Sequence, residues 1–266
     1  MDLVLLKTEI GKVWDRPIFE LAVGFVFLLS LNSISTLIEM VSQARFQSTF
    51  NTMIIEALLT NMNLQLLPLG LLCGILVSLS FARDYEQGLM QTLMSLPLSR
   101  SSIFVVKFIA VVIPLTAIYW GITTLVIILN FHSSVATIIM ILELTIWTLP
   151  ISFLALMFYG GTATLFSLTI RRMIPTVLTT MITGFFTWYI TALTNDTIGD
   201  LADLLVFTPY RVPNVSLGRV LGLSYPETAL ENCLPAWGFL GLALFYALVF
   251  LIPMYLYFTR RFEVRD

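Results

Sequence analysis

The sequence predicts an all-α, polytopic membrane protein with six transmembrane helices. Of its 266 residues, 58% are hydrophobic and only 11% are charged, whereas soluble domains carry about 25% charged residues. Such a chain cannot cover a globule with polar side chains, so its solvent must be largely lipid. About 20 apolar residues cross a hydrocarbon core of roughly 30 Å. We expect one transmembrane domain over residues 1–266, with spans at about 17–39, 65–82, 103–129, 136–170, 173–193 and 236–258.

Residues 1–16 precede the first apolar run and have the pattern of an amphipathic helix. Their larger apolar residues fall on one helical face; these are Leu3, Leu6, Ile10, Val13 and Trp14. The pattern is typical of a helix that lies on the membrane surface with its cations towards the headgroups. A disordered tail is the alternative, and no cleavable signal peptide is expected.

The first span carries one acid, Glu20, close to its boundary. There the carboxylate can reach interfacial water, which favours a structural role over the lining of a pathway. Residues 40–64 contain several polar side chains, and we expect them to form a loop with at most a short helical turn at residues 54–59.

The second span contains three small residues at a spacing of four, namely Gly70, Gly74 and Ser78. Residues at this spacing lie on one helical face, and small side chains there let another helix approach closely. Packing within the chain and contact with a second copy are both consistent with this stripe.

A polar segment separates the second and third spans. Within it Leu89, Met90, Leu93 and Met94 recur at helical spacing, so a short amphipathic helix is expected, with Gly88 at its start and Pro97 at its end. A helix that only binds headgroups is usually rich in Lys and Arg. This segment carries acids as well as bases, which favours docking of a soluble partner over an interfacial linker.

The order of residues in this segment resembles the cytoplasmic loop of ABC-2 type permeases, the membrane subunits of one class of ATP-binding-cassette transporters. The resemblance rests on Asp84-Tyr85-Glu86-Gln87-Gly88, Leu93, Ser95-Leu96-Pro97-Leu98-Ser99-Arg100 and Lys107-Phe108. Leu89 stands where the family usually has Thr or Ser. The likeness covers the whole chain in architecture, but only residues 84–108 are specific.

The resemblance implies that this helix couples the chain to a separate ATPase subunit docked on residues 84–101. In that role Asp84, Glu86 and Arg100 would make polar contacts with the ATPase, and Gly88 and Pro97 would shape the loop. Leu89, Leu93 and Met94 would fill a groove on the partner. Two permease copies, identical or similar, would form the pathway, and the ATPase subunit would bind the ATP.

Residues 136–170 are apolar almost throughout and exceed the length of one upright span. Either one long helix bends at Pro150, or a hairpin turns near Pro150 or Gly160-Gly161. With one helix here, 11 Lys and Arg residues lie on the inner side and 3 on the outer, whereas a hairpin gives 8 and 6. The rule that positive residues stay on the cytoplasmic side favours one helix and six spans, with both termini in the cytoplasm. We expect the protein to lie in the plasma membrane.

Residues 195–235 form a long outer segment before the last span. Its apolar pieces, residues 198–207 and 215–223, are too short to cross, and an extracytoplasmic helical hairpin is expected there, as in ABC-2 permeases. Thr208-Pro209-Tyr210-Arg211, with Asn214 and Leu217, resembles the subfamily that serves nitrous oxide reductase maturation, which would add an extracytoplasmic partner. The last span ends at Arg260-Arg261, also as in this family.

The chain lacks motifs for its own chemistry. It has no phosphate-binding loop of the G-x-x-x-x-G-K-[ST] type and only one histidine, so neither ATP hydrolysis nor a zinc protease is expected. No metal, cofactor or nucleic-acid partner is predicted.

Glu143 is the acid placed deepest in a span, and such acids are costly in a membrane. It would line a pathway or pair with another helix. We therefore expect a transporter permease, most naturally an exporter; a channel-like or scaffold subunit, or an intramembrane enzyme, is the alternative.

Overall fold

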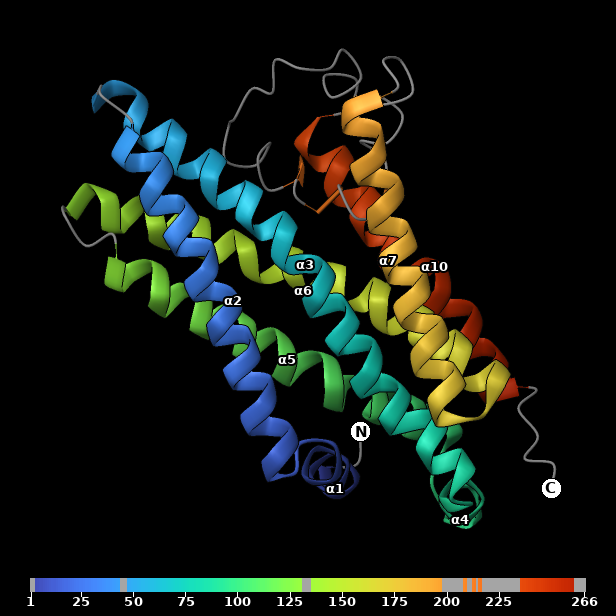
Figure 1. Ribbon diagram of the computed structural model, residues 1–266. Helices are drawn as coiled ribbons and strands as arrows, with labels where there is room; N and C mark the ends of the chain where they lie inside the picture. Colours follow the sequence, from blue (N-terminus) through green and yellow to red (C-terminus); the bar gives the residue numbers. More distant parts are fainter. Residues whose placement is uncertain are drawn as a thin grey trace.

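The computed structural model describes residues 3–43, 47–130, 135–197, 208–209, 212–213, 215–216 and 235–260. Every regular element in these ranges is helical, which confirms the all-α prediction for this part of the chain (Figure 1). The helices are α1 (Leu3–Val13), α2 (Arg16–Gln43), α3 (Gln47–Glu86), α4 (Leu89–Ser95), α5 (Arg100–Asn130), α6 (Val135–Ile170), α7 (Met173–Thr197) and α10 (Ala236–Arg260).

Four of these helices are long and apolar enough to cross a membrane. The qualifying segments are Leu67–Glu86, Arg100–Leu125, Thr145–Ile170 and Trp237–Arg260. The apolar stretches of α2 and α7, Pro17–Leu31 and Met173–Phe186, are shorter within the described residues. Length and composition are those of a multi-pass membrane protein.

The outer faces of the helices agree with this assignment. On α7, for example, seven large apolar side chains are exposed, namely Ile174, Leu178, Met181, Ile182, Phe185, Phe186 and Tyr189. A continuous exposed apolar face of this kind marks contact with a membrane or another protein.

The prediction of a loop at residues 40–64 is wrong. Helix α2 continues to Gln43, and α3 already begins at Gln47 and runs for 40 residues. The physical reason is that residues 47–64 hold no glycine or proline. Their polar side chains lower the hydropathy but leave the helical backbone intact.

Helix α6 settles the choice between one long helix and a hairpin at residues 136–170. It runs without interruption from Val135 to Ile170 and contains Pro150 in its interior. One continuous helix is therefore confirmed, and the Gly160-Gly161 pair lies within it rather than in a turn.

The small-residue stripe of α3 packs against helices of the same chain. A Cβ atom on Gly70 would lie 2.5 Å from the Tyr159 ring of α6, and one on Gly74 would lie 2.5 Å from Thr180 Cγ2 of α7. Ser78 is fully buried. Of the two alternatives for this stripe, packing within the chain is the one observed.

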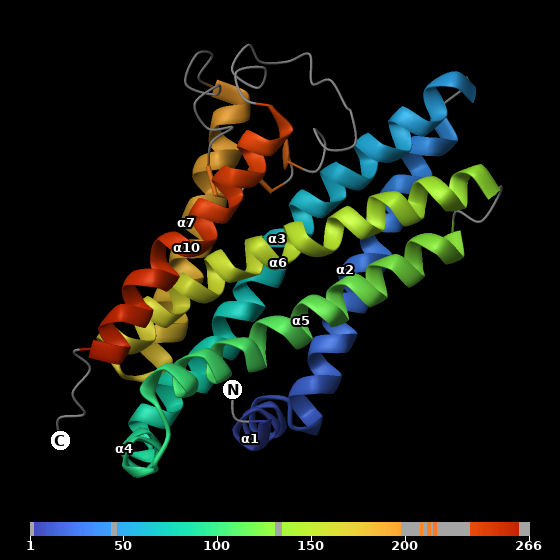
Figure 2. The same cartoon turned by 180° about the vertical axis from the view of Figure 1, so that it is seen from behind.

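Several elements that are distant in sequence gather at one end of the molecule, which we call the α4 end. It comprises α1, α4, the α6–α7 turn at residues 171–172 and the last turn of α10 (Figures 1 and 2). Away from this end, α7 and α10 diverge from α2 and α5 (Figure 1).

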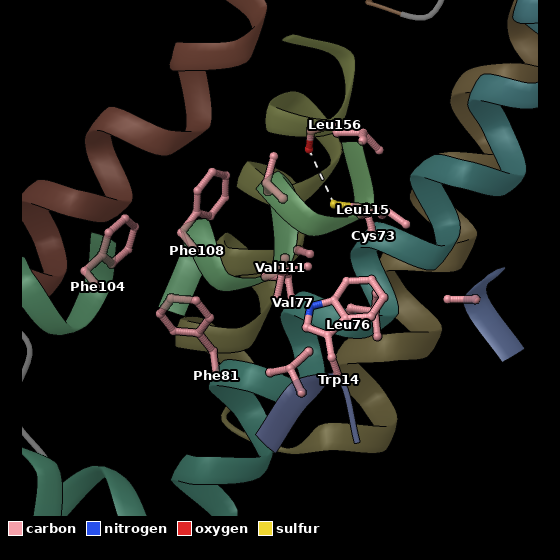
Figure 3. Packing of buried hydrophobic residues seen from close by; sticks show 14 of the residues in the cluster. Trp14, Cys73, Leu76, Val77, Phe81, Phe104, Phe108, Val111, Leu115 and Leu156 are labelled. Carbon is pink, nitrogen blue, oxygen red and sulfur yellow. Dashed lines mark hydrogen bonds between the residues drawn. The ribbon is translucent and has the colours of Figure 1, made fainter. Parts of the chain in front are cut away.

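The hydrophobic core lies next to the α4 end. Trp14 just after α1, Leu76 and Phe81 of α3, and Val111 and Leu115 of α5 meet there (Figure 3). Since Val13 of α1 and Trp14 directly after it are both buried, α1 is part of the packed body and not a detached surface helix.

Candidate functional site

The segment between α3 and α5 forms the predicted short helix, α4. Gly88 precedes it with φ of 71°, in the left-handed region that glycine adopts without strain. Pro97 follows its last turn, and the Ser99 hydroxyl oxygen then accepts from Ser102 N at 3.2 Å, which caps α5. The expected position of Gly88 at the start of this helix is confirmed, and Pro97 turns the chain after the helix has ended at Ser95.

Helix α4 has a buried face and an exposed face. Met90 is buried, and Leu93 and Met94 pack partly against the core. Leu89 is 41% exposed and Leu96, just after the helix, is 45% exposed. The residues predicted to fill a groove on a partner therefore divide: Leu93 and Met94 attach α4 to its own chain, and Leu89 faces outwards.

Four charged side chains meet inside the molecule where α1, α3 and α5 come together. We call them the charge cluster: Glu9 and Lys12 of α1, Asp84 of α3 and Lys107 of α5. Lys107 Nζ donates to Glu9 Oε2 and to the Ser80 carbonyl oxygen, both at 3.0 Å. It also donates to one carboxylate oxygen of Asp84, and Lys12 Nζ donates to the other.

Three members of the charge cluster are buried, and the fourth, Lys12, keeps 27% of its side chain exposed. Asp84, Lys107 and Glu9 are 0%, 1% and 3% exposed. Removing an ion from water costs several kcal/mol unless partners of opposite charge and hydrogen bonds replace the water. Here two acids face two bases, so the cluster is neutral and its ionic groups are paired. It holds three helices in one arrangement.

Two expectations are corrected by this cluster. Asp84 was expected on the loop surface as a contact to a partner, but it lies inside the bundle because Lys12 and Lys107 draw it there. Lys12 was expected to face the headgroups, but it turns inwards to Asp84. A direct contact between Asp84 and a partner is not available in this arrangement.

A second polar junction connects the end of α3 with the α6–α7 turn. Arg171, with φ of 60°, donates from Nη1 to the Tyr85 hydroxyl at 2.8 Å, and its guanidinium lies 5.0 Å from the centre of the Tyr85 ring. Met173 N, in the first turn of α7, donates to Glu86 Oε2 at 3.2 Å. A carboxylate at a helix N-terminus is favourable, so Glu86 helps to fix α7.

A third contact joins α1 to a proline inside α5. An ordinary residue at position 114 would donate its backbone N–H to the carbonyl of Ala110, but Pro114 has no N–H. Trp14 Nε1 donates to that carbonyl oxygen instead, at 2.8 Å. Since Lys107 lies one helical turn from Ala110, α1 is fastened to α5 at two successive turns.

Apart from Glu86 in the second junction, the remaining predicted site residues are not part of these three contacts. Glu86, Pro97 and Arg100 are exposed at the α4 end. Glu20 is exposed on the first turns of α2. Glu143 belongs to α6, but its side chain lies outside those described, and so do most of the residues of the expected extracytoplasmic hairpin. Among the residues that the structure describes, no three His, Cys, Asp or Glu side chains gather as a metal site.

Sequence reasoning missed the pairing of Glu9 and Lys107. One signal was present: Glu9 lies three residues after Leu6 and four before Val13, so it falls on the apolar face of α1. An acid on an apolar stripe indicates a buried partner of opposite charge.

No protein-family model matches the chain, and no curated protein matches it significantly. The resemblance to ABC-2 permeases therefore stays a prediction.

Proposed function

We propose that the chain is the permease subunit of an ATP-binding-cassette transporter, with six spans and a separate ATPase subunit docked at the α4 end. It carries no ATP site of its own; the ATPase subunit binds the nucleotide. Two permease copies form the pathway in the plasma membrane, with both termini and the α4 end in the cytoplasm, and the direction of transport is outwards.

The observation that supports this proposal best is the set of contacts that join the elements at the α4 end. Helix α4 is attached to the core through Met90, α3 and α5 are joined by Asp84 and Lys107, and the α6–α7 turn is held by Tyr85. A force on α4 therefore reaches α1, α3, α5 and α7 together. A loop that merely lay on headgroups would not need such connections.

The same contacts suggest how ATP binding would be coupled to transport. Closure of the ATPase subunit displaces α4, and the helices fastened to it move as one body relative to the second copy. Ligand binding then selects between two arrangements of the pathway. Asp84 acts as a positioning residue in this scheme, and Leu89, Leu96, Glu86 and Arg100 supply the exposed contact surface.

The pathway residues follow from the same scheme. Glu20 is exposed on α2, so in the assembly it would face lipid or the second copy rather than the interior of its own chain. Glu143 remains the candidate acid within α6, and an extracytoplasmic partner would meet the segment before α10.

Copurification tests the docking surface. We expect an ATP-binding-cassette protein to copurify with the chain from native membranes, and Leu89→Asp with Leu96→Asp to abolish this because both place a charge in an apolar contact. Arg260→Glu is the control, since Arg260 is exposed at the same end but on α10.

Two outcomes would contradict the proposal. One is the absence of any ATP-binding-cassette protein together with unchanged transport in Glu86→Lys. The other is ATP hydrolysis by the purified chain alone. Conductance in a bilayer without ATP would favour a channel instead.

A further inference from the structure

A groove of about 260 Å³ lies between α5, α6 and α10. Its lining is apolar throughout and includes Val105, Ile109 and Ile113 of α5, Met157 of α6, and Leu251 and Ile252 of α10. The three residues of α5 are spaced by four, so they form one continuous stripe along that helix.

The groove exists because α5 and α10 both pack mainly on α6 and touch each other only near the α4 end. A Cβ atom on Gly160 would lie 3.0 Å from the Phe108 ring, and one on Gly161 would lie 3.4 Å from the backbone nitrogen of Leu251. The glycine pair thus brings both neighbours close to α6. Helices α5 and α10 diverge away from the α4 end (Figure 1), and Met157 of α6 is among the residues that line the groove.

The mouth of the groove opens on the outer surface of the bundle. Ile113 and Ile252 are 49% and 48% exposed there. All three helices that form the groove are long and apolar enough to cross a membrane. The medium at the mouth is therefore hydrocarbon, and the groove offers no polar group that would hold water.

The dimensions match a lipid chain. At about 1.5 Å per residue, the lining from Phe104 to Ile113 extends for roughly 14 Å, which is close to half of a hydrocarbon core of about 30 Å. Its volume also exceeds the roughly 150 Å³ at which an apolar cavity already binds benzene.

Polar groups lie just beyond the end of the groove nearest α4. Phe104 closes the apolar part by packing edge-on against Tyr255, with 5.6 Å between ring centres; Figure 3 shows Phe104 and Phe108 on the side of α5 nearest α10. Beyond it, the Tyr255 hydroxyl donates to Ser101 Oγ at 3.0 Å. The neighbouring Arg100 is exposed.

We propose that this groove is a binding site for one bilayer phospholipid, with an acyl chain along the α5 stripe and its headgroup at Ser101, Tyr255 and Arg100. Apolar walls below a hydroxyl pair and a cation reproduce the order of chain, ester region and phosphate in such a lipid. The inference rests on the membrane helices alone and does not require the transport function.

Native mass spectrometry of the protein extracted in detergent tests this site. The wild-type chain is expected to retain one phospholipid, identified by its mass. Ile109→Trp fills the middle of the groove from a partly exposed position and should lose that bound-lipid peak. Leu125→Trp is the matched control, because Leu125 is exposed on the same helix away from the groove.

A second measurement separates loss of the lipid from loss of the fold. Added phospholipid is expected to raise the unfolding temperature of the wild type and of Leu125→Trp but not of Ile109→Trp, with all three showing the same helical circular dichroism beforehand. The proposal would be overturned if the two tryptophan variants retained equal amounts of lipid. It would also be overturned if the wild type retained detergent and no phospholipid.

Discussion

Lys107 is the residue on which the charge cluster depends most. It is the only member that touches both acids, Glu9 and Asp84, and it also bonds a backbone carbonyl. Without its ammonium group Glu9 would lose its partner, and Asp84 would keep only Lys12. A buried ion pair adds little net stability over apolar packing, but the removal of one partner is expensive.

We therefore expect Lys107→Met to lower the free energy of unfolding by about 3–5 kcal/mol. Denaturant titration of the purified protein in micelles, followed by circular dichroism, measures it. Lys7→Met is the control, because Lys7 is exposed on α1 and surface changes stay within about 0.5 kcal/mol. The loss should be less than additive with Asp84→Asn, since the two share one contact. A fully additive double variant would mean that the two side chains do not interact.

Gly70 and Gly121 differ in how much space surrounds them. Gly70→Ala places a methyl group within 2.5 Å of the buried Tyr159 ring, and overpacking of this kind costs about 1–3 kcal/mol. Gly121→Ala makes the same chemical change where no atom lies within 4 Å. It should be neutral or stabilising by up to about 1 kcal/mol through helix propensity. The same titration compares them, and equal effects at both sites would refute the close approach of α3 and α6.

The side-chain contacts within the charge cluster could not be predicted from the sequence. A lysine at the start of a span and an acid on an amphipathic helix are visible as unusual positions. Their contact joins residues 98 positions apart, and only the packing of α1 on α5 brings them together. Periodicity places a residue on a face of its own helix but does not identify the helix that this face meets.

At the scale of elements, α1 matters because it supplies what the proline of α5 removes. Pro114 leaves the Ala110 carbonyl without its helical donor, and an unsatisfied buried carbonyl costs about 1–3 kcal/mol. Trp14 satisfies it with a bond of 2.8 Å. Since the indole also packs in the core, the contact sets both the position and the rotation of α1.

Trp14→Phe should therefore destabilise the protein by about 1–3 kcal/mol, because it keeps an aromatic ring but removes the donor. In a Pro114→Ala background the new backbone N–H can bond Ala110, so the same substitution should cost less. Unfolding free energies of the four proteins give the coupling between the two sites. A coupling of zero would show that Trp14 acts by packing alone.

The elements themselves were largely predictable. The bounds of α5, α6, α7 and α10 lie within a few residues of the expected spans, since long apolar runs and the absence of a strong break define them. The failure at residues 40–64 arose from treating polarity as a sign of a loop. A helix that projects beyond the apolar layer can carry polar residues along its whole surface, because α-helical backbone bonds are satisfied internally.

For the molecule as a whole, the proposed orientation in the membrane depends on where the cations lie. The described elements at the α4 end carry many of the cations of the chain, namely Lys7, Lys12, Arg83, Arg100, Arg171, Arg172 and Arg260. Positive residues stay on the cytoplasmic side of the membrane during insertion. The proposed six-span topology would therefore place α1, α4 and the end of α10 on that side.

This orientation is testable by cysteine labelling. In a background without Cys73 and Cys233, Thr92→Cys places a thiol on the exposed face of α4. A membrane-impermeant maleimide should label it in inside-out vesicles but not in intact cells. His132→Cys, between α5 and α6, should show the reverse pattern, because one span separates the two positions. Labelling of Thr92→Cys from outside would reverse the orientation and remove the surface on which an ATPase subunit could dock, whereas labelling of both positions from one side would show that α5 does not cross the membrane.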